Sequence, residues 1–259
     1  MKKSLIALAV AGSFAAPAFA ATSNVDIYGI FGASVDIIDR DISTQDNEFR
    51  LSSTASRIGF KGSEDLGGGL SAIWQVETAL NIDTNAGGAW GSRNTFVGLS
   101  SKSLGTVRLG HYDTAYKMST GRLDVFVDTL ADYNTIMGSA SGSNAAFDVR
   151  EQNSISYETP DISGLKLMGT YGQRNEGGSK TLNPELWSLA ATYANGPLFG
   201  ALAYEIHKDV GVNRDVDAVK AALGYKFGST TLGAAYEKID DDAANSVLSR
   251  NAWYLSARH

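Results

Sequence analysis

Apolar and polar residues alternate with a period of two through most of the sequence, in segments of about eight to twelve residues bounded by Gly, Asn, Asp and Ser. In 186–194, Trp187 and Leu189 fall on one face and Ser188 on the other. Such a pattern predicts a strand with one apolar and one polar face. We therefore expect strands to be the building unit from Val25 onward.

The alternation divides the chain into about twelve expected strands. They cover 25–39, 50–65, 70–80, 92–102, 106–117, 153–159, 165–172, 186–194, 198–207, 216–227, 230–239 and 251–259. The short connections are 66–69, 103–105, 160–164, 195–197 and 228–229. The long connections are 40–49, 81–91, 118–152, 173–185, 208–215 and 240–250.

Long and short connections therefore alternate strictly along the chain. An up-and-down barrel in an outer membrane shows this asymmetry, with tight periplasmic turns and longer external loops. A soluble sandwich shares the period-two pattern but has no reason to keep such a rhythm. We predict an all-β, antiparallel, up-and-down transmembrane β-barrel whose apolar strand faces meet lipid.

The first twenty residues differ from the rest and indicate a cleaved signal peptide. Lys2 and Lys3 form a charged start, 5–11 is apolar, and Ala18-Phe19-Ala20 is a small-x-small cleavage site. A membrane anchor is the alternative, but the small residues and Pro17 favour cleavage. We assign 1–20 to the signal peptide and 21–259 to the barrel domain.

Composition and motifs argue against several other functions. The chain has no Cys, which excludes disulfides and thiol chemistry, and its three His residues lack zinc-site spacing. No G-x-S-x-G motif occurs, and a net charge of −6 without a basic cluster argues against nucleic-acid binding. We expect no enzymatic activity, no cofactor and no metal. The run Asp240-Asp241-Asp242 could hold a divalent cation, although a solvated external loop is the favoured interpretation.

Four segments carry a more specific signature. They are Val25-Asp26-Ile27-Tyr28-Gly29, Ser56-Arg57-Ile58-Gly59-Phe60-Lys61-Gly62-Ser63-Glu64-Asp65-Leu66-Gly67-Gly68-Gly69-Leu70, Arg93-Asn94-Thr95-Phe96-Val97-Gly98-Leu99 and Gly105-Thr106-Val107-Arg108-Leu109-Gly110. In them the chain resembles the general porins of Gram-negative bacteria, of the neisserial and betaproteobacterial type. The resemblance implies an outer-membrane homotrimer of sixteen-stranded barrels. It also implies that each barrel is a water-filled pore for ions and small hydrophilic solutes, narrowed by an inward-folded third loop.

The sequence departs from this family at its C-terminal end. The family's last strand normally ends in an aromatic residue, whereas here the sequence reads Arg258-His259 after about twelve expected strands. A closed twelve-stranded barrel is geometrically possible. The resemblance favours the other interpretation, a C-terminally truncated sequence.

Strand parity predicts which side chains face the lumen. Where an apolar pair such as Ile58 and Phe60 faces lipid, the residues between and beside it face water. The same reasoning takes Phe96 as outward-facing. The predicted inward-facing residues are Arg57, Lys61, Arg93, Thr95, Val97, Arg108 and Tyr112, and we include Glu77 among the pore-lining candidates.

The connection 118–152 is the longest, and long loops are uncommon unless functional. Apolar residues recur in it at helical spacing: Leu123, Phe126, Val127 and Leu130. Acids recur at every fourth position: Asp124, Asp128 and Asp132. We predict a short amphipathic helix with its apolar side on the barrel wall and its carboxylates toward the lumen; a surface helix in an external loop is the alternative. By resemblance this is the constricting loop, whose acids would face the arginines.

These expectations describe an open channel. Opposed charges across a narrow aqueous gap create a transverse field that passes polar solutes and slows apolar ones. The alternative is a barrel whose loops serve as an adhesin or receptor and whose lumen is plugged.

Overall fold

The structure is a computed structural model that describes residues 24–39, 48–84, 89–138, 146–174, 183–212, 214–242 and 249–259. The expected signal peptide lies outside these residues. The strands are β1 (Asn24–Ile30), β2 (Ala33–Ile38), β3 (Glu48–Ser53), β4 (Arg57–Gly67), β5 (Leu70–Ala79), β6 (Thr95–Ser101), β7 (Gly105–Asp113), β8 (Arg150–Glu158), β9 (Leu165–Gln173), β10 (Glu185–Asn195), β11 (Leu198–Gly211), β12 (Arg214–Phe227), β13 (Thr230–Asp241) and β14 (Arg250–Arg258).

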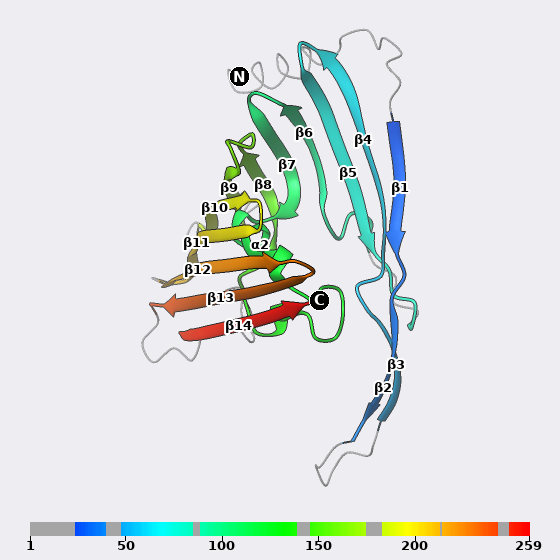
Figure 1. Cartoon of the computed structure of the whole chain (residues 1–259). Coiled ribbons are helices and arrows are strands. Elements are labelled where there is room, and N and C mark those ends of the chain that lie inside the picture. The colour runs from blue at the N-terminus through cyan, green and yellow to red at the C-terminus, as the bar shows by residue number, and fades with distance from the viewer. Residues whose placement is uncertain are drawn as a thin grey trace.

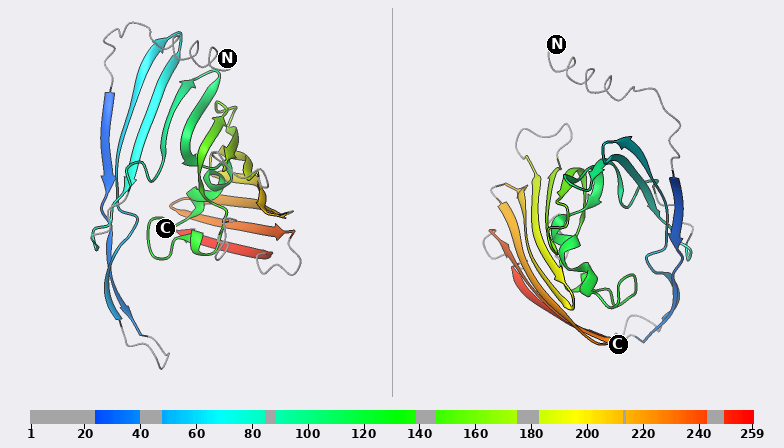
Figure 2. Two further views of the ribbon diagram at one scale, coloured as in Figure 1. Left: turned by 180° about the vertical axis from the view of Figure 1, so that it is seen from behind. Right: turned by 45° about the horizontal axis from the view of Figure 1, so that its top comes forward.

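Twelve of these strands form one antiparallel sheet, in the order β1-β4-β5-β6-β7-β8-β9-β10-β11-β12-β13-β14 (Figure 1). From β4 onward each strand pairs with the next in sequence, which confirms the predicted up-and-down arrangement. The sheet curves into the wall of a β-barrel (Figure 2). β1 and β14 are its edge strands, and no backbone pairing joins them within the described residues.

The first hairpin is interrupted halfway along its length. β2 and β3 pair with each other in a separate two-stranded sheet that continues the β1–β4 pair (Figure 1). At the interruption the Thr54 amide donates to the Gly32 carbonyl at 2.9 Å, and Ala55 has a φ of 48°. Two predicted strands, 25–39 and 50–65, are therefore each split by an irregular step rather than missing.

Several predicted strand boundaries differ from the structure, and two of the differences have a clear physical reason. The strand expected at 106–117 ends at Asp113, because Thr114 caps a helix by accepting the Lys117 amide with its side chain. Most of the connection expected at 208–215 is strand instead, because β11 and β12 continue pairing to Gly211 and Arg214 beyond a register shift. The hairpin is longer there and its loop shorter than predicted.

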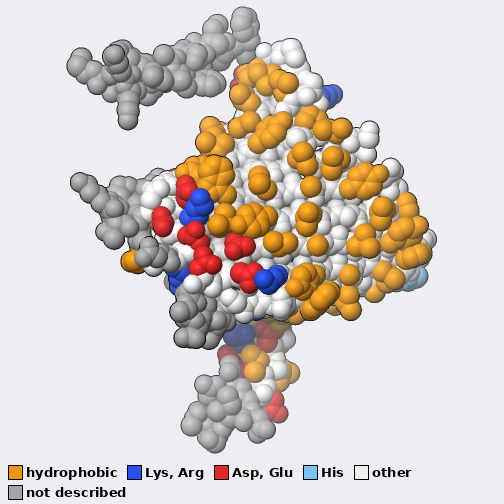
Figure 3. Space-filling model, turned by 90° about the vertical axis from the view of Figure 1, so that its left-hand side faces the viewer, with side chains coloured by type: hydrophobic (Ala, Val, Ile, Leu, Met, Phe, Trp, Pro, Cys, Tyr) orange, Lys and Arg blue, Asp and Glu red, His pale blue; other side chains and the backbone are white. Residues whose placement is uncertain are grey.

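The outer face of the wall is apolar and exposed. Leu189 and Leu223 are 60% and 59% exposed, and Trp187 is 47% exposed. Figure 3 shows hydrophobic side chains spread over a broad face, with acidic and basic side chains gathered toward one side of it. Monomeric soluble proteins rarely expose so continuous an apolar surface, whereas a lipid-facing barrel requires one.

The segment between β7 and β8, residues 114–149, we call the inner loop; its described residues, 114–138 and 146–149, lie against part of the inner face of the sheet. It contains helix α2 (Ala115–Thr120) and two 3-10 turns, η1 (Gly121–Leu123) and η2 (Tyr133–Thr135). The amides of Ala115 and Tyr116 donate to the hydroxyls of Thr170 on β9 and Ser188 on β10. The right-hand view of Figure 2 shows the inner loop inside the curved sheet, as predicted for a constricting loop.

The amphipathic helix predicted around 123–132 is wrong. The Asp124 carboxylate accepts the amide of Phe126, and Asp128 has a φ of 64°; both features divert the backbone from a helix. Leu123 is buried, whereas the other apolar residues of the predicted stripe are exposed: Phe126, Val127 and Leu130. The helix of the inner loop lies earlier, at α2, and no helix in the described part of the chain is long and apolar enough to span a membrane.

Candidate functional site: a charged constriction

Arg57 at the start of β4 links the barrel wall to the inner loop. Its Nη2 lies 2.8 Å from Asp128 Oδ2, and its Nη1 donates to the Ala55 carbonyl at 2.9 Å. The positive φ of Asp128 turns the loop so that this carboxylate reaches the wall. Arg57 and Asp128, both predicted lining residues, therefore meet across the lumen face.

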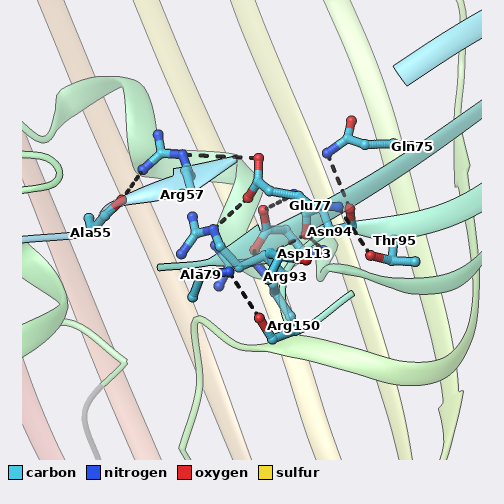
Figure 4. Close-up of polar contacts among 12 residues, drawn as sticks. Ala55, Arg57, Gln75, Glu77, Ala79, Arg93, Asn94, Thr95, Asp113 and Arg150 are labelled. Atoms are coloured by element: carbon cyan, nitrogen blue, oxygen red, sulfur yellow. Dashed lines mark hydrogen bonds and ion pairs between the residues drawn. The ribbon is translucent and has the colours of Figure 1, made fainter. Parts of the chain in front are cut away.

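The Glu77 carboxylate on β5 is shared by three neighbouring side chains, those of Arg93, Tyr28 and Arg57. Its Oε1 lies 2.5 Å from Arg93 Nε, and its Oε2 accepts the Tyr28 hydroxyl at 2.8 Å. Arg57 Nε is 4.0 Å from the same Oε2. Gly59 permits this arrangement, because a Cβ there would lie 2.2 Å from the ring of Tyr28. Figure 4 shows Arg57 and Arg93 converging on Glu77.

Sequence reasoning missed Arg150, the third arginine of this cluster. Its Nε lies 3.2 Å from Asp113 Oδ1 and donates to the Asn94 side chain at 3.1 Å (Figure 4). Lys117 of α2 approaches the same Asp113 oxygen at 3.0 Å. Arg150 lies within the predicted connection 118–152, so strand parity does not place it. The alternation of 153–159 does not extend backward to Arg150 either, because the register between β7 and β8 shifts between Ser154 and Glu151 and Asn153 has a φ of 47°.

The predicted orientation of β6 is wrong. Gly98 pairs with Arg108, so Phe96 shares the lumen face with Arg108, while Val97 pairs with Leu109 on the outer face. Val97 is 61% exposed there, and Thr95 falls on the same side by parity. Phe96 misleads because an aromatic residue in a barrel strand usually faces lipid.

Arg108 and Tyr112 form a separate group on β7. The Arg108 guanidinium lies 4.8 Å from the Tyr112 ring centroid and 5.7 Å from that of Phe96, and its Nη1 is 3.5 Å from Glu158 Oε2. Lys61 lies farther along β4, with its Nζ 5.5 Å from the Tyr28 ring. These residues lie on the inner face of the sheet, but Arg108 has its own partners rather than those of Arg57 and Arg93.

Asp124 and Asp132 hold the inner loop in shape. Asp124 accepts the amides of Phe126 and Tyr133, and Asp132 accepts those of Asp128 and Asn134. Of the three predicted loop acids, Asp128 alone ion-pairs with an arginine of the cluster, within the described residues. The expectation that all three would face the arginines is wrong.

On the opposite wall, Glu237 of β13 anchors the inner loop. Its carboxylate accepts the Tyr116 hydroxyl at 2.8 Å and the Gly138 amide at 2.8 and 2.9 Å, and Arg250 Nη2 lies 3.3 Å away. Glu237 and Tyr116 are fully buried. Burial of a carboxylate costs free energy unless the carboxylate is hydrogen-bonded. Here Tyr116 and Gly138 connect Glu237 to the inner loop, and Arg250 connects it to the neighbouring strand β14.

A second buried pair lies beside this anchor. Lys220 of β12 forms an ion pair with Asp148 of the inner loop, and its Nζ lies 4.1 Å from the Tyr116 ring centroid. Burial raises the pKa of Asp148 to about 6, although Lys220 opposes the rise. Burial raises the pKa of Tyr116 as well, so its hydroxyl remains a donor to Glu237.

The fold and this site define an outer-membrane β-strand protein with an inward-folded loop and a charged constriction. A family model described as Gram-negative porin matches residues 7–258. The chain belongs to the Gram-negative porin family. Its location is the cell outer membrane of such bacteria.

The chain is similar to curated outer-membrane proteins of Neisseria. It is 33% identical to the major outer membrane protein P.IB of Neisseria gonorrhoeae over 212 residues, which are 78% of this chain and 56% of that protein. It is also 33% identical to the P.IB protein of Neisseria meningitidis serogroup B, strain H44/76, over 95% of this chain and 74% of that protein. The chain thus spans about half to three quarters of the length of these relatives.

Solved structures share the fold. An anion-selective porin from Comamonas acidovorans is similar over 91% of this chain and 74% of that chain, with 27% identity and a TM-score of 0.78. OmpT of Vibrio cholerae, folded in vitro, aligns over 91% of this chain and 70% of that chain, with 18% identity and a TM-score of 0.67. The second likeness supports the fold alone.

Proposed function

We propose that the protein forms a water-filled channel for passive diffusion of ions and small hydrophilic solutes across the outer membrane. The contact between Arg57 on the wall and Asp128 on the inner loop carries this proposal, because it sets fixed charges of both signs against the lumen. Partly buried charges are screened less than charges in bulk water, so they act strongly on a passing solute.

The pore-lining residues we propose are the predicted Arg57, Lys61, Arg93, Arg108, Tyr112, Glu77 and Asp128, with Arg150 and Asp113 added. Asp124 and Asp132 support the lining by shaping the inner loop. The anion selectivity of the Comamonas porin supports a contribution of arginines to selectivity here. No chemical step is required, because the charges only sort what diffuses through.

We further propose that three copies assemble into a homotrimer, as the family resemblance implies. Insertion of the folded protein into planar bilayers in KCl tests both statements. We expect stable ohmic conductance steps grouped in threes, and none from heat-denatured protein. A sealed barrel that acts as an adhesin or receptor would insert without conducting, and single independent steps would contradict the trimer.

A further inference from the structure

A second cationic site lies away from the constriction. A cavity of about 180 Å³ opens between the inner loop and the ends of β10 to β14, beside the turns at 196–197 and 228–229. Three cations from separate segments line it: Arg122 of η1, Lys226 of β12 and Arg258 of β14. Strand parity places Lys226 and Arg258 on the lumen face, since they continue the series of the buried Lys220 and Ala252.

These three cations have no carboxylate partner among the residues that the structure describes. The Arg122 guanidinium lies 4.4 Å from the Phe199 ring centroid, and Arg258 Nη2 donates to the backbone carbonyl of Asp124 at 3.3 Å. The carboxylate of Asp124 points elsewhere, to the amides of Phe126 and Tyr133. Even when the charge of Asp124 is counted, the cavity keeps a net positive charge.

We propose that this cavity binds a small oxyanion, such as phosphate or a short dicarboxylate. Guanidinium and ammonium groups are the strongest donors to such oxygens, and three of them converge on one space. Thr231 and Ser256 add hydroxyl donors to the lining, and Leu123 and Phe199 close its apolar side. The volume suits one small anion rather than a polymer.

The position of the site gives it a role that rests on the proposed channel function. The turns beside it are short, and short turns lie on the periplasmic side of outer-membrane barrels. An anion that moves from the constriction toward the periplasm would reach this cavity before it leaves the pore. The site would hold anions at the periplasmic mouth, whereas the binding itself does not depend on transport.

Calorimetric titration of inorganic phosphate into the full-length folded protein in detergent tests the binding. We expect saturable binding with a Kd on the order of millimolar. The Lys226→Gln variant leaves the inner loop untouched and should bind about threefold more weakly, and Arg122→Gln with Lys226→Gln about tenfold. Lys102→Gln is the matched control: it removes one cation from the short turn between β6 and β7, outside the cavity.

Three outcomes would overturn the inference: no saturable binding, unchanged affinity in the double variant, or an equal loss in Lys102→Gln. Circular dichroism and heat stability of each variant separate lost binding from lost folding. Planar bilayers separate this inference from the channel proposal. Chloride steps that phosphate added on the short-turn side does not reduce would reject the role of the site at the periplasmic mouth and keep the channel. Saturable phosphate binding without any conductance steps would keep the site and reject the channel.

Discussion

Arg57 on β4 and Asp128 in the inner loop form an ion pair of 2.8 Å between residues 71 positions apart in sequence. The contact fixes the loop against the part of the wall that also carries Glu77 and Arg93. The wall on the other side holds the same loop through Glu237 and Lys220. The loop is therefore attached at both walls, and its charged tip is positioned rather than free.

Replacing Asp128 with Asn should change selectivity without unfolding the barrel. The variant removes one negative charge and frees Arg57, so the reversal potential in a KCl gradient should shift toward anions. The lost pair contributes about 1 to 3 kcal/mol to docking of the loop tip, because both groups are partly buried. Glu64→Gln is the control, because Glu64 is an exposed acid on β4, the strand that carries Arg57. It should leave the reversal potential unchanged, and an equal shift there would contradict the assignment of Asp128 to the pore lining.

Neutralising the arginine cluster should shift selectivity the other way. Arg57, Arg93 and Arg150, each replaced by Gln, should move the reversal potential toward cations because fixed positive charge is lost. Arg108→Gln should produce a smaller shift, since Arg108 lies with Tyr112 and Glu158 outside this cluster. If Arg108→Gln shifts the potential as far as Arg150→Gln, the structural division between the two groups is wrong.

Glu237→Ala should release the inner loop from the β13 wall. The change leaves the Tyr116 hydroxyl and the Gly138 amide without their acceptor, which costs about 2 to 5 kcal/mol at a buried site. We expect noisier single-channel currents and a lower heat-denaturation temperature. Tyr116→Phe removes one bond and should show a smaller effect. Quiet currents from Glu237→Ala would show that this anchor does not hold the loop.

The raised pKa of Asp148 predicts a specific pH dependence of the free energy of unfolding. Its folded-state pKa is raised from 3.8 to about 6 by burial, and Glu237 and Glu205 add to the rise while Lys220 opposes it. The folded state therefore binds the proton more tightly than the unfolded state, so this group lowers stability as pH rises from about 4 to 6. The loss amounts to at most about 3 kcal/mol.

Asp148→Asn isolates this contribution. Denaturant unfolding of the wild type and the variant, measured from pH 4 to 7, should differ in slope, with the downward contribution absent in the variant. At pH 7 the variant also leaves Lys220 without its ion-pair partner, which lowers the absolute stability. The two proteins are therefore compared by how their free energy of unfolding changes with pH. Parallel curves across this range would contradict a raised pKa at Asp148.

Much of the wall could be predicted from sequence, because alternation is a local signal that each strand carries by itself. Trp187 and Leu189 illustrate this, since their parity alone placed them outward, as the structure confirms. Phe96 shows the limit: its lumen orientation depends on the register with Gly110 and on contacts to Tyr112 that no local pattern encodes.

The conformation of the inner loop is harder to predict from sequence than the strands of the wall, because helical spacing of apolar residues does not ensure a helix. The apolar spacing of 123–130 suggested one, but Asp124 and Asp128 direct the backbone through turns that serve long-range contacts. The anchors on the far wall, Glu237 and Lys220, had no sequence signal beyond being charged residues at inward positions. Their partners come from the inner loop, 72 to 121 residues away in sequence.

The central claim is that the wall separates lipid on its outer face from water on its inner face. The absence of cysteine allows clean single-cysteine variants. Nitroxide labels at Leu189→Cys and Leu223→Cys, in the protein reconstituted into vesicles, should relax with lipid-soluble oxygen. A label at Lys61→Cys should instead relax with a water-soluble nickel chelate. Labels at 189 and 223 that respond to the chelate, or a label at 61 that responds to oxygen alone, would contradict the account.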